Sequence, residues 1–324
     1  MTDGVHAPFD LARIADSICL CRQRLPSQTA LARARVSIAW TIAQILSGID
    51  QLVVERLLDA KGLTADSGPA LILGTSRRTS VLDAAFVNGA ASRAARPSIA
   101  GTELSRQIAP IVALLLSIGE VRAVAGESFL RAYLIGAVTA SALRRANLGD
   151  ADNAVSLVVP AVAAASHILA LDARQLFTAI ELALKLVADK DNSLAAGEFA
   201  PIYAGYCVLT ALFAAQFAES APAESGSRAG EKTHAGPEGF EAVAQALPSA
   251  SFDELWTEFD DIARCRLPRD QIAPLFDLLD NVGSVSNIGK LTRLLEAKVK
   301  PDGARAIIFA KAGEHDAPET TWVP

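Results

Sequence analysis

Histidine and cysteine are scarce in this chain, with four residues of each among 324. The histidines stand at 6, 167, 234 and 315, so no two have the i, i+4 spacing of a helical metal site. The cysteines at 19, 21, 207 and 265 have no zinc-binding spacing either. We therefore expect buried, reduced thiols and neither a metal nor an organic cofactor.

The chain also has no excess of positive charge and no glycine-rich nucleotide-binding motif. The net charge is −6, which argues against a nucleic-acid partner because such a partner needs a basic face. No glycine-rich phosphate loop follows a strand, and no G-x-S-x-G motif occurs. These absences exclude the dinucleotide-binding, P-loop and serine hydrolase classes.

Neither a targeting signal nor a membrane span stands out. The first residues, MTDGVHAPFD, are acidic and carry no apolar core of a signal peptide. The longest apolar runs, such as 108–118, are shorter than the roughly 20 residues that cross a bilayer. We therefore expect a cytoplasmic protein without a membrane partner.

Alanine and leucine dominate what is present, and both favour closely packed helices. Apolar residues recur every three to four positions, which predicts an all-α fold, a large multi-helix domain with little or no sheet. Pro110 implies a kink or a helix start within one of these segments. The predicted helices are 8–23, 27–60, 81–95, 103–120, 126–146, 154–170, 173–188, 199–218, 268–281 and 284–298.

One stretch, ESAPAESGSRAGEKTHAGPE, is poor in hydrophobic residues and reads as a linker. The predicted organisation is therefore a helical domain whose N-terminal part is 1–218, a flexible linker at 219–238, closing helices of the same domain at 239–300, and a tail at 301–324.

The order of several segments resembles the MmgE/PrpD family, which includes 2-methylcitrate dehydratase, cis-aconitate decarboxylase and iminodisuccinate epimerase. The resemblance implies a helical domain that dimerises. The segments that carry it are LDAAFVNGAA, IAPIVALLLSIGE, VAGESFLRAYLIGAVTASAL, VPAVAAASHILALDARQLFTAIELAL, AAGEFAPIYAGYCVLTALFAAQF and GPEGFEAV, followed by the closing helices from SFDELW onward.

The chain departs from the family after its glycine-phenylalanine turn. Family members insert an α+β lid there, and their active site lies between the lid and the helical domain. Here Phe240 is followed almost at once by Phe252 and Trp256, so the lid is expected to be missing.

The catalytic positions implied by the family also differ. Counted from the Asn-Gly pair at 88 and 89, the family's histidine falls on Arg93, and its acidic run begins at Arg96. A second histidine falls near Glu103, and a later one has no match in NLGDADNAVSL. The family's lysine falls at about residue 192, where Lys190 is the nearest lysine.

The family's reactions begin by moving a proton beside a carboxylate, which requires a base and groups that hold negative charge. The candidate residues are Glu103 and Lys190 as catalytic groups, and Arg93, Arg96, Arg106 and Tyr203 as substrate-binding groups. The simpler interpretation is structural: the arginines and the lysine are solvated, and Glu103 interacts with a helix dipole.

Two hypotheses therefore stay open. The chain is a reduced MmgE/PrpD-like lyase or isomerase, of dehydratase, decarboxylase or epimerase type, acting on a small carboxylate at a diverged site. Alternatively, it is a catalytically silent helical homologue that serves as a dimerisation or anion-binding partner, as a homodimer or as a mixed dimer with a full-length relative.

Overall fold

The computed structural model describes residues 10–60, 68–95, 101–146, 148, 153–187, 197–222 and 239–297. This part of the chain holds thirteen α-helices and a single two-stranded sheet, so the predicted all-α class is confirmed. The helices are α1 (Leu11–Arg22), α2 (Gln28–Gly48), α3 (Leu52–Asp59), α4 (Val81–Ala94), α5 (Glu103–Val121), α6 (Gly126–Arg145), α7 (Ala154–Ile168), α8 (Ala173–Val187), α9 (Ala200–Glu219), α10 (Phe240–Ala246), α11 (Phe252–Ala263), α12 (Arg269–Asp280) and α13 (Gly289–Leu294).

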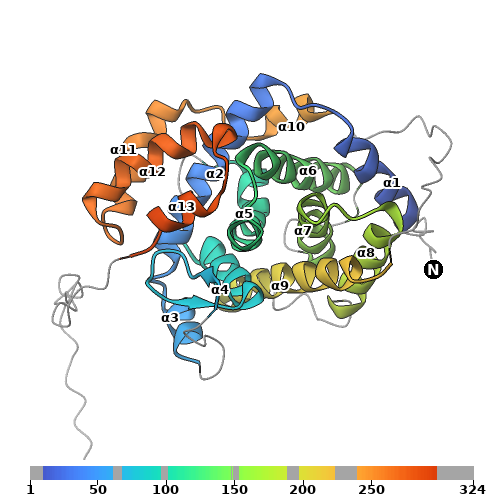
Figure 1. Cartoon of the computed structure of the whole chain (residues 1–324), viewed down its shortest axis with the longest axis horizontal. Coiled ribbons are helices and arrows are strands. Elements are labelled where there is room, and N and C mark those ends of the chain that lie inside the picture. Colours follow the sequence, from blue (N-terminus) through green and yellow to red (C-terminus); the bar gives the residue numbers. More distant parts are fainter. Residues whose placement is uncertain are drawn as a thin grey trace, which may run out of the picture.

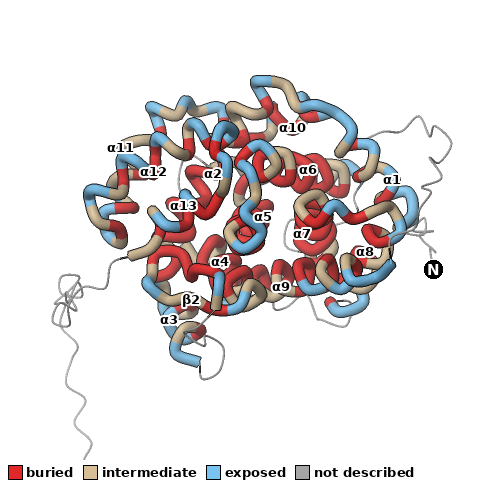
Figure 2. The backbone as a smooth tube through the Cα atoms, in the orientation of Figure 1, coloured by how far each residue is buried: buried red, intermediate tan, exposed pale blue. Residues whose placement is uncertain are grey.

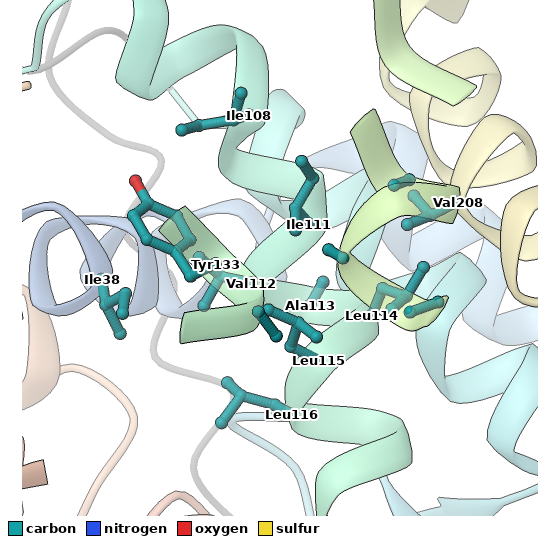
Figure 3. Close-up of a cluster of buried hydrophobic side chains, with 14 of the residues drawn as sticks. Ile38, Ile108, Ile111, Val112, Ala113, Leu114, Leu115, Leu116, Tyr133 and Val208 are labelled. Atoms are coloured by element: carbon teal, nitrogen blue, oxygen red, sulfur yellow. The ribbon is translucent and has the colours of Figure 1, made fainter. Parts of the chain in front are cut away.

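The core is built around α5, which packs against α2, α4, α6, α7, α9 and α13 (Figure 1). Its residues from 107 to 119 are all buried, and the inner faces of the surrounding helices are buried with them (Figure 2). Side chains from Ile108 to Leu116 meet Ile38, Tyr133 and Val208 in one apolar cluster (Figure 3). A helix that is apolar on every side is stable in water only when other elements enclose it, and α5 is enclosed in this way.

Side-chain caps fix several helix starts. Ser80 accepts a hydrogen bond from the backbone N–H of Asp83 at 3.1 Å, which caps α4. Asp172 accepts one from the backbone N–H of Gln175 at 2.8 Å, which caps α8. Each cap satisfies a backbone donor that has no partner within its helix.

Two predicted helices are shorter than expected. The segment 27–60 is not one helix, because α2 ends at Gly48 and α3 leaves at an angle of 71°. Gln51 adopts an extended backbone between them, which interrupts the helical hydrogen bonds. The last segment is a 3₁₀ turn, Val282–Ser284, followed by α13, because Asn287 accepts from the backbone N–H of Gly289 at 2.7 Å and starts a new helix.

The sheet is a minimal hairpin in which β1 (Ala70–Leu71) pairs antiparallel with β2 (Arg78–Thr79). It lies between α3 and α4 in the chain, within the segment that the sequence marks only as a break with a short apolar run. Its strands pack against α4 and α5.

Residues 239–297 contain helices and no strand, as expected for this stretch. In this region α10, α11 and α12 pack against α2, and α13 packs against α5. The domain boundaries themselves stay a prediction, because the proposed linker lies almost entirely outside the described residues.

The thiols are partly as expected. Cys21 and Cys207 are buried, and Cys19 is half-buried. Burial raises the pKa of Cys21 to about 11 and that of Cys207 to about 12, so both stay protonated. Cys265 is exposed, so the prediction of a buried thiol is wrong there.

The length argument against a membrane span does not hold. The run 108–118 belongs to the 19-residue α5, and Glu103–Val121 and Gly197–Glu219 are both long and apolar enough to cross a membrane by length and composition. The bent pair α2 and α3 passes the same test when taken as one segment. In the structure, 83% of the apolar window of α5 is buried by other parts of the chain.

Candidate functional site

One end of the bundle carries most of the predicted site. Contacts join the ends of α4 and α6 to the start of α5, α5 to the start of α7, and the end of α8 to the start of α9. Arg93 reaches the start of α5, and Arg144, at the end of α6, lies 3.1 Å from Glu103. We call this region the polar end; its described residues are 93–95, 101–107, 142–146, 153–156, 184–187 and 197–206.

The Asn-Gly pair positions α4 at this end. The buried side chain of Asn88 accepts from the backbone N–H of Leu73 at 2.9 Å and donates to the carbonyl of Leu71 at 3.0 Å. Gly89 faces Gly205 on α9, where an added Cβ would lie 3.2 Å from the Gly205 Cα and 2.7 Å from a Val208 methyl. The pair therefore ties α4 to the hairpin on one side and to α9 on the other.

Arg93 has a structural partner that follows from the sequence of α5. Pro110 lies inside α5 and has no N–H, so the carbonyl of Arg106, four residues earlier, lacks its helical donor. The guanidinium Nη1 of Arg93 donates to that carbonyl at 3.2 Å. Pro110 is therefore not a helix start. The hydrogen bond that it removes from α5 is replaced by one from the Arg93 side chain of α4.

The same device recurs in α7. Pro160 lies inside that helix and frees the carbonyl of Ser156. Gln107 of α5 donates to this carbonyl through Nε2 at 3.4 Å, while its buried Oε1 has no hydrogen-bond partner. Two side chains of the polar end therefore replace backbone donors that prolines remove.

Glu103 is the first residue of α5, directly after the Thr102 cap. Its side chain is 60% exposed and pairs with Arg144. A carboxylate at a helix N-terminus is stabilised by the dipole. Glu103 therefore does not meet the condition of burial on which the general-base hypothesis depends.

Tyr203 is the one candidate that is both described and deeply enclosed. Its side chain, in the first turn of α9, is 4% exposed, and its hydroxyl has no nitrogen or oxygen partner; the Cys207 thiol one turn along is the neighbour placed to hydrogen-bond with it. Burial, with a further contribution from the Cys207 thiol one turn along, raises the pKa of Tyr203 to about 12. The phenol therefore stays protonated and can donate a hydrogen bond. Arg106 is half-buried, and Arg96 and Lys190 lie outside the described residues.

With this geometry in place, the comparison with family models is informative. The model of the MmgE/PrpD N-terminal domain matches residues 12–252. The chain belongs to the MmgE/PrpD family. A comparison with curated proteins gave no match.

In this MmgE/PrpD chain, the sequence reasoning missed Asn88, Gln107 and Arg144 as parts of the polar end. Pro160 indicates that the carbonyl of residue 156 lacks its helical hydrogen-bond donor. It does not indicate that Gln107 supplies the replacement. Asn88 belongs to the Asn-Gly pair, but its place in the sequence gives no sign of its buried bonds to Leu71 and Leu73. Arg144 gave no signal, because its pairing with Glu103 depends on how α5 and α6 pack.

Two other polar regions are occupied by structural contacts. The guanidinium of Arg22 donates to the carbonyl of Leu171 at 2.6 Å and to the hydroxyl of Ser166, which ties α1 to α7 and to the link between α7 and α8. Beside it, burial first and then the charges of Arg22 and Arg131 lower the pKa of His167 to about 4. His167 is therefore neutral near pH 7, as expected of a core histidine.

A groove of about 390 Å³ lies between α2 and the start of α11. Its two arginines are engaged, since Arg33 donates to the carbonyl of Ala244 at 2.7 Å and Arg35 pairs with Asp280 at 3.5 Å. Among the described residues, no group of three His, Cys, Asp or Glu side chains is placed to hold a metal ion.

Proposed function

We propose that this MmgE/PrpD family member binds a small carboxylate at the polar end and does not carry out the family's proton chemistry on it. The observation that carries this proposal is the state of the two groups nearest the family's histidine positions. Glu103 is exposed and ion-paired with Arg144, and Arg93 repairs the carbonyl freed by Pro110. Both side chains have structural partners, so neither is free to act as a tuned base.

Binding of an anion has separate support. The described residues of the polar end include Arg93, Arg106, Arg144, Arg145 and Lys185 against the carboxylates of Glu103 and Glu198, an excess of positive charge. Guanidinium groups match carboxylates in charge and in geometry. The phenol of Tyr203 adds a buried donor that has no nitrogen or oxygen partner and only the weak Cys207 thiol beside it.

A second candidate is the lyase or isomerase itself, and the observation that favours it is again Tyr203. A buried, protonated phenol without a nitrogen or oxygen partner is the kind of donor that stabilises an enolate-like charge. In this version Lys190 supplies the base, and Arg96 joins Arg93 and Arg106 in holding the substrate. This activity is a proposal from family membership and from that one hydroxyl.

The test measures binding and proton exchange on the same samples. Small di- and tricarboxylates are titrated calorimetrically into the full chain and then incubated with it in D₂O and followed by NMR. The variants are Arg106→Ala and Tyr203→Phe, with Arg269→Ala as the control because Arg269 is exposed on α12, away from the polar end.

Binding that weakens in Arg106→Ala but not in Arg269→Ala, without exchange of substrate protons, supports the binding protein. Exchange of substrate protons that is present in the original chain and lost in Tyr203→Phe supports the lyase or isomerase hypothesis and refutes the hypothesis of a catalytically silent binding protein. No binding of any acid by the folded chain refutes both. We further propose that the protein works in the cytoplasm without nucleic acid or membrane partners, as a homodimer or as a mixed dimer with a full-length relative.

A further inference from the structure

The groove between α2 and the start of α11 has the size of a site for a small molecule. Its volume of about 390 Å³ lies within the range of about 300–1,000 Å³ that ligand pockets occupy. The two helices that form it pack against each other (Figure 1). The residues that line this α2–α11 groove all lie outside the polar end, so it is a second candidate site.

Two arginines line the α2–α11 groove with donors that the fold leaves unused. Arg33 donates through Nη1 to the carbonyls of Ala244 at 2.7 Å and Leu247 at 3.5 Å. Arg35 also uses Nη1, for the carbonyl and the carboxylate of Asp280. The Nε and Nη2 groups of both side chains make no hydrogen bond to any described residue and reach solvent. These two nitrogens form the side of a guanidinium that binds a carboxylate or a phosphate through parallel hydrogen bonds.

The charge on the groove lining favours an anion. Asp280 is the acidic residue of the lining, and Arg35 pairs with it at 3.5 Å, so the positive charge of Arg33 is left over. The acidic residues that follow in the first turn of α11, Asp253 and Glu254, lie outside the lining. The structural contacts of the two arginines also hold them in place, which lowers the cost of ordering them around a ligand.

Three hydroxyl groups extend this set of donors. Thr29, Ser249 and Ser251 line the groove and are exposed. The Oγ of Ser251 accepts from the backbone N–H of Glu254 at 3.2 Å, so its own hydrogen remains available to a ligand. One carboxylate offers about four acceptor sites on two oxygens, fewer than these donors supply. A phosphate monoester has three terminal oxygens and a charge of about −1.5 to −2, and it fits them better.

The rest of the lining is apolar and includes an aromatic side chain. Ala32 and Val36 come from α2, and Phe252 is the first residue of α11. The ring of Phe252 packs against Phe276 with centroids 4.3 Å apart, which fixes its position. An apolar wall beside a phosphate-binding group fits a ligand that carries an organic part as well as a charge.

We propose that the α2–α11 groove binds a small phosphate monoester, with its phosphate on Arg33 and Arg35 and its organic group against Phe252. This inference goes beyond the proposed carboxylate binding at the polar end. It concerns other residues and another anion, so either proposal can fail while the other holds.

The experiment is isothermal titration calorimetry on the full chain, with phenyl phosphate as the probe. We expect binding with a Kd of about 1 mM or tighter. Inorganic phosphate lacks the ring, and benzoate carries a carboxylate on the same ring. Each is expected to bind at least about 10-fold more weakly than phenyl phosphate.

The main variant is Thr29→Glu, which places a carboxylate on the groove wall and is expected to weaken phenyl phosphate binding at least about 10-fold by repulsion. Thr29 is exposed in the first turn of α2, where a carboxylate is compatible with the helix dipole, so the variant is expected to fold. The matched control is Gln28→Glu, at the neighbouring exposed position outside the lining. It is expected to change the Kd less than about twofold in about 0.15 M salt.

A second variant, Arg33→Lys, keeps the charge but removes the parallel hydrogen bonds, and it is expected to weaken binding about 10-fold. The proposal is overturned if the folded chain does not bind phenyl phosphate, or if Thr29→Glu binds it as well as Gln28→Glu does. Benzoate or inorganic phosphate binding as tightly as phenyl phosphate also overturns it. Phenyl phosphate binding that is lost in Arg106→Ala but kept in Thr29→Glu would locate the ligand at the polar end and overturn it too.

Discussion

The contact between Arg93 and the carbonyl freed by Pro110 predicts a specific energetic coupling. Replacing Arg93 with alanine leaves the Arg106 carbonyl, in the half-buried first turn of α5, without a donor. Losing a hydrogen bond of this kind costs about 1–3 kcal/mol in the free energy of unfolding. Replacing Pro110 with alanine restores a backbone N–H that can bond to the same carbonyl.

Arg93→Ala should therefore cost about 1–2 kcal/mol less in the Pro110→Ala background than in the original chain. The measurement is a double-mutant cycle by urea denaturation, followed by circular dichroism. Pro274→Ala is the matched control, because Pro274 also lies inside a helix, α12, but far along the chain from Arg93. Arg93→Ala should cost the same with and without that change.

Equal costs of Arg93→Ala in the original and Pro110→Ala backgrounds would refute the reasoning. The same variants also distinguish a structural role of Arg93 from a role in carboxylate binding. If Arg93 additionally holds a carboxylate, the double variant Arg93→Ala/Pro110→Ala recovers stability but not affinity.

The remaining predictions concern helix contacts and one titration. Gly205→Ala should lower the free energy of unfolding by about 2 kcal/mol, because its Cβ would lie 2.4 Å from a backbone oxygen of α4; Gly119→Ala, whose Cβ would meet only side-chain atoms at 3.5 Å or more, should raise it by about 0.5–1 kcal/mol. Urea titrations compare the two, and a stabilised Gly205→Ala would contradict the close helix contact. His167 has a pKa of about 4 in the fold against 6.5 in the unfolded chain, so the unfolded state takes up the proton first as pH falls. Stability should be fully present above pH 6.5 and decrease by about 2 kcal/mol toward pH 4, allowing for partial exposure of the ring, and His167→Asn should flatten that profile. Tyr133→Phe should cost about 1–2 kcal/mol by leaving the buried Ser37 hydroxyl without its 2.6 Å partner, and Ser37→Ala in that background should recover part of the loss.

Much of the fold could be predicted from the sequence because its signals are local. Apolar spacing placed α4, α5 and α6 to within a residue or two, and polar residues that favour helix starts, Ser80 and Asp172, cap α4 and α8. The break after Gly48 was missed because the apolar pattern continues through it, whereas the turn depends on the extended backbone at Gln51.

The candidate site was less predictable, because its contacts join residues that are distant in sequence. Alignment with the family's motifs assigned Arg93 and Glu103 to the connection between two helices. It did not predict which groups these two side chains contact. Arg93 bonds a carbonyl exposed by a proline, and Glu103 meets an arginine from another helix. Both contacts follow from how α4, α5 and α6 pack, which composition and spacing do not encode.

The enclosure of α5 has a consequence for synthesis on the ribosome. Of the helices that cover it, only α2 and α4 precede it in the chain, while α6, α7, α9 and α13 are translated afterwards. A nascent chain that has just released α5 therefore displays an apolar segment long enough to resemble a membrane anchor, with four of its six covering helices not yet made. We expect that segment to be prone to aggregation until translation has passed residue 219 and α9 can dock.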